Sequence, residues 1–187
     1  MEPKVSLSHE DQNYLLDLAR QAVWNALQGR PKPKPERRIG LQPYGVFVTL
    51  KKHGHLRGCI GTFRSRDVEE MVIEAALLSA FQDPRFPPVQ AEEYPDLTFE
   101  ISLLTPLEPV QDLQEIQVGR HGLVMEKGPF RGLLLPQVPV EQGWDRETFL
   151  KYTCLKAGLP PNCYKDPDVQ IYRFEALVFS DEEVASS

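Results

Sequence analysis

The apolar residues of the first half of the chain follow two different periods. Between Ser8 and Gly29 they recur every three to four residues, which predicts a helix with one buried face. In the stretches 44–51, 56–63 and 97–104 they alternate with polar or small residues, which predicts strands. A helical period returns before a proline-rich loop and predicts a second helix, whose aligned positions are Val68, Val72, Ala75 and Ser79.

Three helix starts carry side chains that can cap a helix. Ser8 followed by Asp11 is a plausible N-cap with a partner, and Asp67 followed by Glu70 resembles a capping box. Asp145 is the expected N-cap of a third helix in the second half of the chain. These residues fix where the predicted helices begin.

Turn residues predict hairpins in both halves. Lys52-His53-Gly54-His55 separates two of the predicted strands, with Gly54 supplying a positive φ. Lys127-Gly128-Pro129 separates the segments 123–126 and 130–135 in the same way. Strands joined by hairpins and accompanied by helices are typical of an α+β fold with mainly antiparallel sheets.

The order of these elements predicts two subdomains. Residues 1–108 and 166–187 are expected to form a larger subdomain, whose antiparallel sheet is flanked by helices and takes up a last strand over 169–179. Residues 109–165 are expected to form a smaller inserted subdomain with a short antiparallel sheet.

Composition narrows the classes of function. The chain has 187 residues, a net charge of −6 and a pI of about 5.3, and this balance disfavours a nucleic-acid partner. A basic, proline-rich loop over 30–38 is the exception, and it is either a solvated connector or a docking segment for an acidic partner. No apolar run approaches the ~18 residues of a membrane span, so no membrane partner is expected.

The cysteines favour a reducing compartment. There are three, without a CxxC pair, so a disulfide scaffold is not expected. Cys154 has the spacing of a small helix residue that packs in the core, and Cys163 is expected as a loop thiol. With a polar amino terminus that starts no signal peptide, the chain is expected to be cytoplasmic.

The stretch Leu56-Arg57-Gly58-Cys59-Ile60-Gly61-Thr62-Phe63, called the octapeptide below, is the first candidate for a site. In a regular strand Arg57 and Cys59 point to the same side, roughly 7 Å apart along the chain. Gly58 and Gly61 mark a bulge or the close approach of a ligand or of another backbone. Cys59 is either a reactive thiol or a packed strand residue.

Four further features carry candidate chemistry. Glu100 lies on the polar face of its predicted strand, where it is either an acid or base or an ordinary surface carboxylate. His121 lies in a glycine-rich turn and is either a functional or a loop histidine. Arg85 in the proline loop either pairs with Asp83 or reaches the site of Arg57. The His-x-His of the first turn lacks further ligands nearby, so neither a metal nor a cofactor is expected.

The octapeptide resembles the signature of the AMMECR domain family, named after the AMME syndrome chromosomal region. The resemblance continues in family order over nearly the whole chain, through the segments 45–50, 81–88, 99–102, 119–123, 131–138 and 156–159. It implies two subdomains with mostly antiparallel sheets, a cleft between them lined by the octapeptide, and both termini in the larger subdomain. It implies no established reaction. Family members are fused to, or encoded beside, Memo-like proteins and radical-SAM enzymes, which implies a partner subunit or a modifying enzyme.

Three functions follow from these residues. The first is a cysteine-dependent enzyme for a small or peptide-like, anionic substrate, with Cys59 as nucleophile, Arg57 as its activator, His121 as base and Glu100 as proton acceptor. The second is a non-catalytic binding or accessory module, in which Arg57 and Arg85 grip a carboxylate or phosphate beside Gly58 and Gly61. The third, nucleic-acid binding, is the least favoured.

Overall fold

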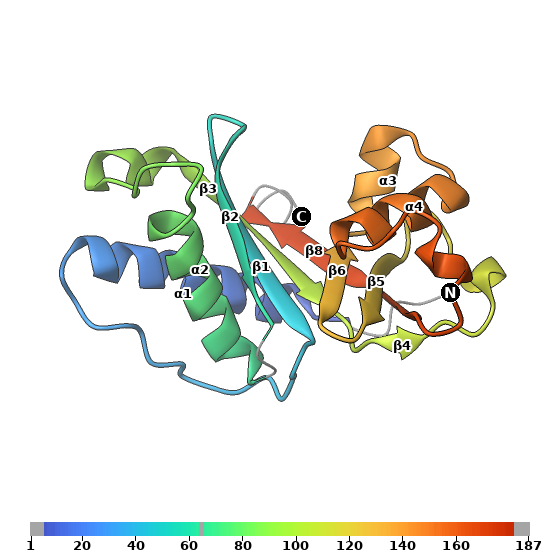
Figure 1. Cartoon of the computed structure of the whole chain (residues 1–187). Coiled ribbons are helices and arrows are strands. Elements are labelled where there is room, and N and C mark those ends of the chain that lie inside the picture. The colour runs from blue at the N-terminus through green and yellow to red at the C-terminus, as the bar shows by residue number, and fades with distance from the viewer. Residues whose placement is uncertain (1–5, 64–65, 182–187) are drawn as a thin grey trace. The chain divides into compact units, whose positions relative to one another are not determined.

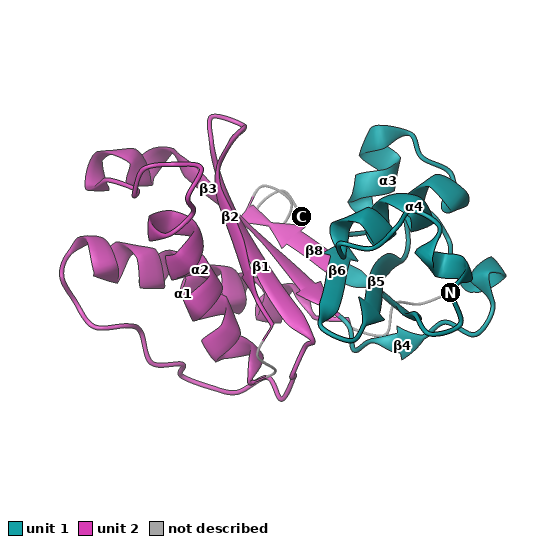
Figure 2. Ribbon diagram, in the orientation of Figure 1, with its two compact units in different colours: residues 1–4, 105–176 teal, residues 5–104, 177–187 magenta. Residues whose placement is uncertain are grey.

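The structure, a computed structural model, describes residues 6–63 and 66–181. Helices accompany two antiparallel sheets, so the predicted α+β class is confirmed (Figure 1). The chain divides into two compact units (Figure 2): of the described residues, 105–176 form unit 1 and the others form unit 2. Unit 1 thus reaches further toward the carboxyl terminus than the 109–165 expected for the inserted subdomain. The cleft expected between subdomains stays a prediction.

Unit 2 is built on a four-stranded sheet. Its order is β2 (His55–Thr62), β1 (Gly45–Lys52), β3 (Leu97–Leu104) and β8 (Ala176–Ser180). β1 runs antiparallel to both of its neighbours, β2 and β3. The predicted two-residue turn between β1 and β2 is confirmed, since His53 and Gly54 both have a positive φ, of 52° and 80°. Because β2 is at one end of the strand order, it is an edge strand of this sheet.

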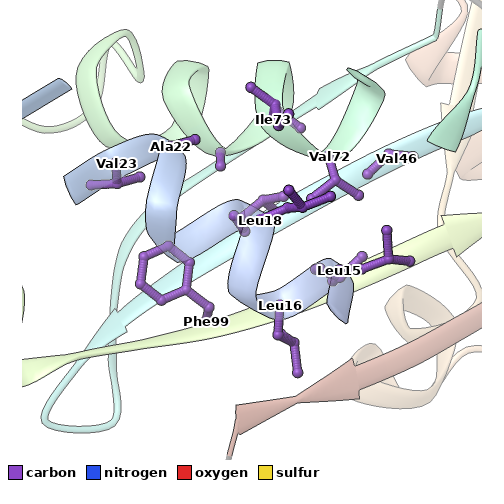
Figure 3. Close-up of a cluster of buried hydrophobic side chains, with 14 of the residues drawn as sticks. Leu15, Leu16, Leu18, Ala22, Val23, Val46, Val72, Ile73 and Phe99 are labelled. Atoms are coloured by element: carbon purple, nitrogen blue, oxygen red, sulfur yellow. The ribbon is translucent and has the colours of Figure 1, made fainter. Parts of the chain in front are cut away.

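Two helices cover one face of the unit 2 sheet. α1 (His9–Leu27) and α2 (Val68–Phe81) pack on each other, and α2 also packs on β1 and β2 (Figure 1). Alternate residues of β1 point at these helices, as strand periodicity requires. They share a core that Figure 3 shows in part, with the buried side chains Leu15, Leu18, Val46, Val48, Leu50, Val72 and Phe99.

Of the two predicted caps in unit 2, one is confirmed. The Ser8 hydroxyl accepts the N–H of Asp11 at 3.1 Å. The capping box at Asp67 is wrong, because the Asp67 side chain makes no cap hydrogen bond. The carboxylate of Glu70 instead pairs with Arg38 at 2.7 Å. A second ion pair joins Arg37 to Asp11 of α1. The two ion pairs attach the basic loop to α1 and α2.

Between α2 and β3 the chain makes a short 3₁₀ helix that the sequence pattern did not indicate. This helix, η1 (Ala91–Asp96), is closed by a capping box in which Gln90 and Glu93 bond to each other's backbone. It places Glu93 beside the sheet, where that carboxylate becomes part of the site described below.

Unit 1 is built on a second four-stranded sheet, in the order β4 (Glu108–Pro109), β7 (Gln170–Phe174), β5 (Gly122–Lys127) and β6 (Phe130–Leu134). All of its pairings are antiparallel. The remaining elements of the unit are the helices α3 (Gln137–Gln142) and α4 (Arg146–Lys156) and the 3₁₀ helices η2 (Leu113–Glu115) and η3 (Cys163–Lys165). The predicted cap of α4 is confirmed, since Asp145 accepts the N–H of Thr148 at 2.8 Å.

The single last strand predicted over 169–179 is wrong. The segment is two strands, β7 and β8, which join different sheets and are separated at Glu175. β7 pairs with β4 and β5, and this pairing is what carries unit 1 to residue 176.

Cys154 is a buried core residue of α4, as predicted, but the expectation that Cys154 and Cys163 are unpaired is wrong. Cys154 on α4 and Cys163 on η3 form a disulfide with their Cα atoms 5.8 Å apart. Of the three cysteines, Cys59 alone is a free thiol. The bond removes the argument for a reducing compartment, which rested on unpaired thiols. Among the helices of residues 6–63 and 66–181, none combines the length and apolar character that a bilayer span requires.

The disulfide closes a short loop and should stabilise unit 1. Its two cysteines are nine positions apart, for which the chain-entropy relation gives about 2–3 kcal/mol. We expect a reductant to lower the Tm of the native protein by roughly 5–10 °C, measured by circular dichroism. The double variant Cys154→Ala/Cys163→Ala should have this lower Tm without reductant, and adding reductant should not change its Tm. An unchanged Tm of the native protein under reduction would contradict the bond.

Candidate active site around Cys59

An extra residue in β2 breaks the strand alternation inside the octapeptide. Lys51 of β1 lies opposite Leu56, but the next residue of β1, Leu50, lies opposite Gly58. Arg57 is therefore the additional residue of a β-bulge. A bulge shifts the register by one residue, so the side chains on its two sides no longer follow one alternation. The prediction that Arg57 and Cys59 share a face of the sheet assumed a regular strand, and the bulge removes that assumption.

Arg57 belongs to the helix-covered side of unit 2. Its Nε and Nη2 donate to the two carboxylate oxygens of Glu93 at 2.9 and 3.1 Å. Lys52, which has the same strand parity as the core residue Leu50, donates to Glu93 at 3.2 Å. Only 8% of Arg57 is exposed. Arg57 thus fastens η1 to the hairpin, and its predicted place beside the Cys59 thiol is wrong.

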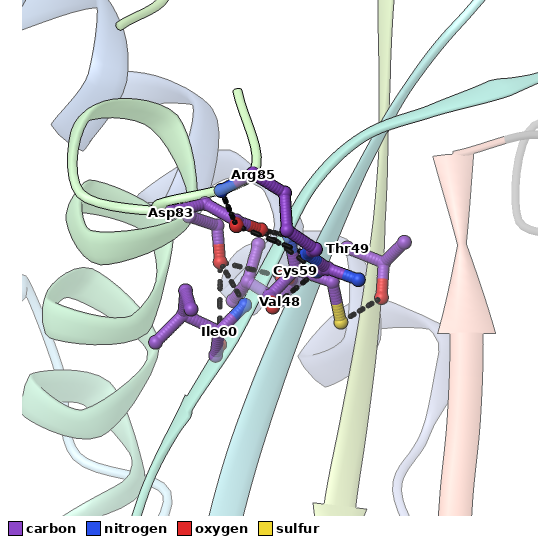
Figure 4. A network of polar contacts seen from close by, with 7 residues as sticks. Val48, Thr49, Cys59, Ile60, Asp83 and Arg85 are labelled. Atoms are coloured by element: carbon purple, nitrogen blue, oxygen red, sulfur yellow. Dashed lines mark hydrogen bonds and ion pairs between the residues drawn. The ribbon is translucent and has the colours of Figure 1, made fainter. Parts of the chain in front are cut away.

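Cys59 lies on the opposite face, in a row of three polar side chains. Thr49 of β1 pairs directly with Cys59 of β2 and with Glu100 of β3. The Thr49 Oγ1 lies 3.1 Å from the Cys59 Sγ, a contact drawn in Figure 4. A thiol, a hydroxyl and a carboxylate therefore cross three neighbouring strands. We call this side of the sheet, with Thr49, Lys51, Cys59 and Glu100, the Cys59 face.

Glu100 is partly exposed on this face. Its carboxylate lies 3.7 Å from the Nζ of Lys51, which is two positions from Thr49 along β1. The sequence left Glu100 either in a site or on an ordinary surface. Its strand register brings it into the row of Cys59, while its role as an acid or base stays a prediction.

Asp83 organises the edge of the site. Its Oδ2 accepts the backbone N–H of Cys59 at 2.9 Å. Its two oxygens also accept the Nε and Nη2 of Arg85 at 3.1 and 2.8 Å, and Oδ1 accepts the Arg85 backbone N–H at 3.0 Å (Figure 4). Only 2% of the Asp83 side chain is exposed. Its hydrogen bonds with Arg85 hold the pKa of Asp83 well below its usual range, so the carboxylate stays charged.

Arg85 completes this arrangement by donating from Nη2 to the carbonyl of Cys59 at 3.2 Å. The N–H and C=O of Cys59, which β2 presents at the sheet edge, are thus both satisfied. The sequence offered two roles for Arg85, pairing with Asp83 or reaching the candidate site. The pairing with Asp83 is confirmed, and the guanidinium also contacts the Cys59 carbonyl, whereas a site shared with Arg57 stays a prediction.

The environment of Cys59 favours the protonated thiol. Burial raises the pKa of the Cys59 thiol, and the contact with Thr49 and the charge of Arg85 offset this only in part. The arginine that acts on the thiol is therefore Arg85, and not Arg57 as expected. In the absence of a ligand, Cys59 does not have the lowered pKa of an activated nucleophile.

The two glycines of the octapeptide are explained by packing. A Cβ on Gly58 would lie 2.1 Å from the backbone carbonyl oxygen of Ser79 in α2. A Cβ on Gly61 would lie 2.7 Å from the ring of Phe47. The glycines were expected to mark a bulge or a close approach, and both occur. The group that approaches Gly58 is a helix backbone, and neither glycine needs a ligand to account for it.

His121 belongs to unit 1, whereas Cys59 belongs to unit 2. Only 2% of His121 is exposed. Its Nδ1 accepts the backbone N–H of Gln117 at 3.0 Å, and its Nε2 lies 3.3 Å from the Nη1 of Arg173. Burial and the neighbouring guanidinium groups lower the pKa of His121, so the ring is neutral. Its role as a base for Cys59 stays a prediction.

Two functional residues were missed by the sequence analysis. Thr49 was assigned to a strand but not to the site, because a regular hairpin would place it opposite Gly58. No pattern in the sequence distinguished Glu93 from the other carboxylates of the chain. Within residues 6–63 and 66–181, no group of three or more histidine, cysteine, aspartate or glutamate side chains could hold a metal ion. The histidine of the first turn, His53, lies 3.7 Å from Asp96 instead.

The buried pair of Arg57 and Glu93 predicts a pH-dependent stability. The hydrogen bonds from Arg57 lower the pKa of Glu93 from 4.5 to about 2. A carboxyl whose pKa is lower in the folded state stabilises the protein above its unfolded pKa and loses this as the pH falls toward 2. We expect Glu93→Gln to cost roughly 3 kcal/mol at pH 7. In urea unfolding the difference from the native protein should shrink between pH 5 and pH 2.

The neighbouring carboxylate Glu92 provides the matched control, because its side chain is exposed and on the same 3₁₀ helix. Glu92→Gln should change the free energy of unfolding by less than about 0.5 kcal/mol at any pH. If the cost of Glu93→Gln were the same at pH 3 and pH 7, the charge of Glu93 would not be what holds Arg57.

Comparison with known proteins shows the family of this chain. The AMMECR1 family model matches residues 16–179. Protein TK0174 of Thermococcus kodakarensis is 48% identical over 183 residues, which cover 90% of this chain and 89% of that protein. A protein of Methanothermobacter thermautotrophicus is 46% identical over 188 residues, with 94% and 97% covered.

A solved structure agrees with the sequence relatives. The crystal structure of uncharacterized protein PH0010 from Pyrococcus horikoshii has a TM-score of 0.79 to this chain at 45% identity, and 90% of each chain is covered. These names state no substrate or reaction. The resemblance first indicated by the octapeptide is confirmed, and the chain belongs to the AMMECR1 family.

Proposed function

We propose that the Cys59 face of unit 2 binds a small or peptide-like ligand with an anionic group, and that Arg85 contacts that group. The observation that carries this proposal is the clamp formed by Asp83. One carboxylate fixes both the backbone of Cys59 and the guanidinium of Arg85. The cation is therefore held in one orientation beside the thiol.

Arg85 has the properties of an anion contact. Its side-chain hydrogen bonds within the described residues use Nε and Nη2, which leaves Nη1 for a ligand. About half of its side chain, 55%, is exposed. A guanidinium that is already oriented loses little conformational entropy when it binds a carboxylate or phosphate. Lys51 adds a second exposed cation on the same face, next to Glu100.

Cys59 would contact the ligand as a neutral thiol. Its Sγ is near the Thr49 hydroxyl, and its raised pKa keeps it protonated near neutral pH. A covalent step is the finer proposal, and the row of Cys59, Thr49 and Glu100 is what favours it. In such a step Glu100 would take up the thiol proton while Sγ adds to a carbonyl carbon of the ligand, whose C=O π bond breaks and leaves its electron pair on the oxygen.

A non-catalytic accessory module is the alternative function. In that case the anionic group would belong to a peptide segment of a protein partner, and Memo-like or radical-SAM proteins are the candidates that the family resemblance implies. Nucleic-acid binding has the least support, since the chain carries a net charge of −6. An affinity for nucleic acid that falls steeply with salt concentration would favour this function, because phosphate contacts release counterions.

Binding at Arg85 can be tested with simple anions. In an NMR titration with acetate and with inorganic phosphate, we expect the amide signals of Cys59 and Arg85 to shift and saturate. Arg85→Gln removes the charge-assisted contact and should weaken binding about tenfold or more. Arg37→Gln is the matched control, because Arg37 is another partly exposed arginine of unit 2 paired with an aspartate. Equal weakening in both variants would refute a site at Arg85.

The state of the thiol can be tested by alkylation against pH. We expect Cys59 to react slowly at pH 7, with a midpoint above the ~8.5 of a free thiol. Thr49→Val removes the contact that partly lowers the thiol pKa, and should move the midpoint further up. Mass spectrometry separates Cys59 from the disulfide cysteines. A midpoint below that of a free thiol would instead mark Cys59 as an activated nucleophile.

A further inference from the structure

Unit 1 contains a small cavity that the proposed function does not use. Its volume is about 110 Å³, and its polar lining comes from five charged or titratable residues and one hydroxyl. They are Thr105, Glu108, Arg120, His121, Arg173 and Glu175. A cavity of this size holds a few water molecules or one small polar group.

The hydrogen bond at Nδ1 decides the tautomer of His121. The backbone N–H of Gln117 points at this nitrogen from 3.0 Å. A backbone N–H can only donate, so Nδ1 must carry the lone pair. The neutral ring then carries its proton on Nε2. His121 is consequently a hydrogen-bond donor toward the cavity and has no free basic nitrogen there.

This proton faces a second donor. The Nη1 of Arg173 lies 3.3 Å from the His121 Nε2, and neither group can accept a hydrogen bond from the other when Nε2 is protonated. The Nε of Arg173 is also buried and has no hydrogen-bond partner within the described chain. Buried donors without an acceptor are costly, so His121 Nε2–H and Arg173 Nη1–H, which face each other beside the cavity, point to a missing acceptor.

The charges around the cavity select the kind of acceptor. Arg173 pairs with Glu108 at 3.1 Å and has Glu115 at 3.9 Å, while Arg120 pairs with Glu175. Three carboxylates thus surround two guanidinium groups and a neutral imidazole. This local excess of negative charge disfavours an additional anion and leaves a neutral oxygen as the better acceptor.

We propose that this cavity binds a carboxamide group, of a small molecule or of a peptide. Its carbonyl oxygen accepts from His121 Nε2–H and from Arg173 Nη1–H, and its N–H donates to the carboxylate of Glu108. The carbonyl supplies the acceptor that the two donors lack, and the amide N–H gives Glu108 a donor in addition to Arg173 without adding charge. The site is confined to unit 1 and does not depend on Cys59 or Arg85.

The tautomer provides the first test and needs no ligand. Long-range ¹H–¹⁵N correlation spectra distinguish a protonated from an unprotonated ring nitrogen. We expect Nε2 of His121 to be protonated and Nδ1 unprotonated at pH 7. A proton on Nδ1, or on both nitrogens, would overturn the proposal, because the pair of facing donors would then not exist as described.

The second test uses acetamide, acetate and methylammonium as probes of the complete protein. We expect acetamide to shift the signals of His121 and Arg173 to saturation, and acetate to bind at least tenfold more weakly. His121→Phe removes the Nε2–H donor and should weaken the binding of acetamide at least tenfold. Arg131→Gln, at a charged position on β6 outside this cavity, should leave the affinity for acetamide unchanged.

Three results would overturn the proposal. Acetate binding as tightly as acetamide would make this an anion site, and methylammonium binding in place of acetamide would make it a cation site. No saturable shift with any probe would mean that the cavity holds water only. Where His121→Phe fails to fold, Arg173→Lys replaces it, because it keeps the charge but removes the Nη1 donor, and it should weaken acetamide by the same factor.

Discussion

One additional residue in β2 determines which side chains meet in unit 2. Counting back from the two-residue turn, Thr49 would lie opposite Gly58, and Cys59 would lie opposite Val48 on the helix-covered side. The bulge at Arg57 moves the register by one, so that Cys59 pairs with Thr49 instead. Arg57 stays on the helix-covered side, where it pairs with Glu93. The composition of the candidate site therefore depends on the bulge more than on any single functional side chain.

The bulge is held in place from both sides of the hairpin edge. On one side Gly58 lets the backbone of α2 approach so closely that a Cβ would collide with the Ser79 carbonyl. On the other, Asp83 accepts the Cys59 N–H and aligns Arg85 on the Cys59 carbonyl. A buried carboxylate is stable only when paired and hydrogen-bonded, and Asp83 meets both conditions. The thiol is thus positioned by a rigid edge strand, which suits ligand recognition.

Local patterns sufficed for much of the fold, but not for the site. The α1 period, the Ser8 and Asp145 caps and the His53-Gly54 turn involve residues close in sequence, and all were predictable. The bulge was not, because a one-residue register shift is set by pairing with β1 and by packing on α2. The break between β7 and β8 is marked by Glu175 alone. The disulfide joins Cys154 to Cys163 after the chain turns at the end of α4, where Gly158 has a φ of 81°, and spacing did not reveal this pairing.

The electrostatics of Cys59 bear on the choice between recognition and covalent chemistry. Arg85 is the charge that lowers the thiol pKa, against the larger opposing effect of burial. An anion bound to Arg85 would partly neutralise that charge and lie near the sulfur, so it would raise the thiol pKa further. Binding an anion and generating a thiolate therefore oppose each other at this position. A nucleophilic Cys59 would need Glu100 to accept its proton in the complex, whereas recognition by a neutral thiol needs no such change, and this asymmetry favours binding as the primary role of the face.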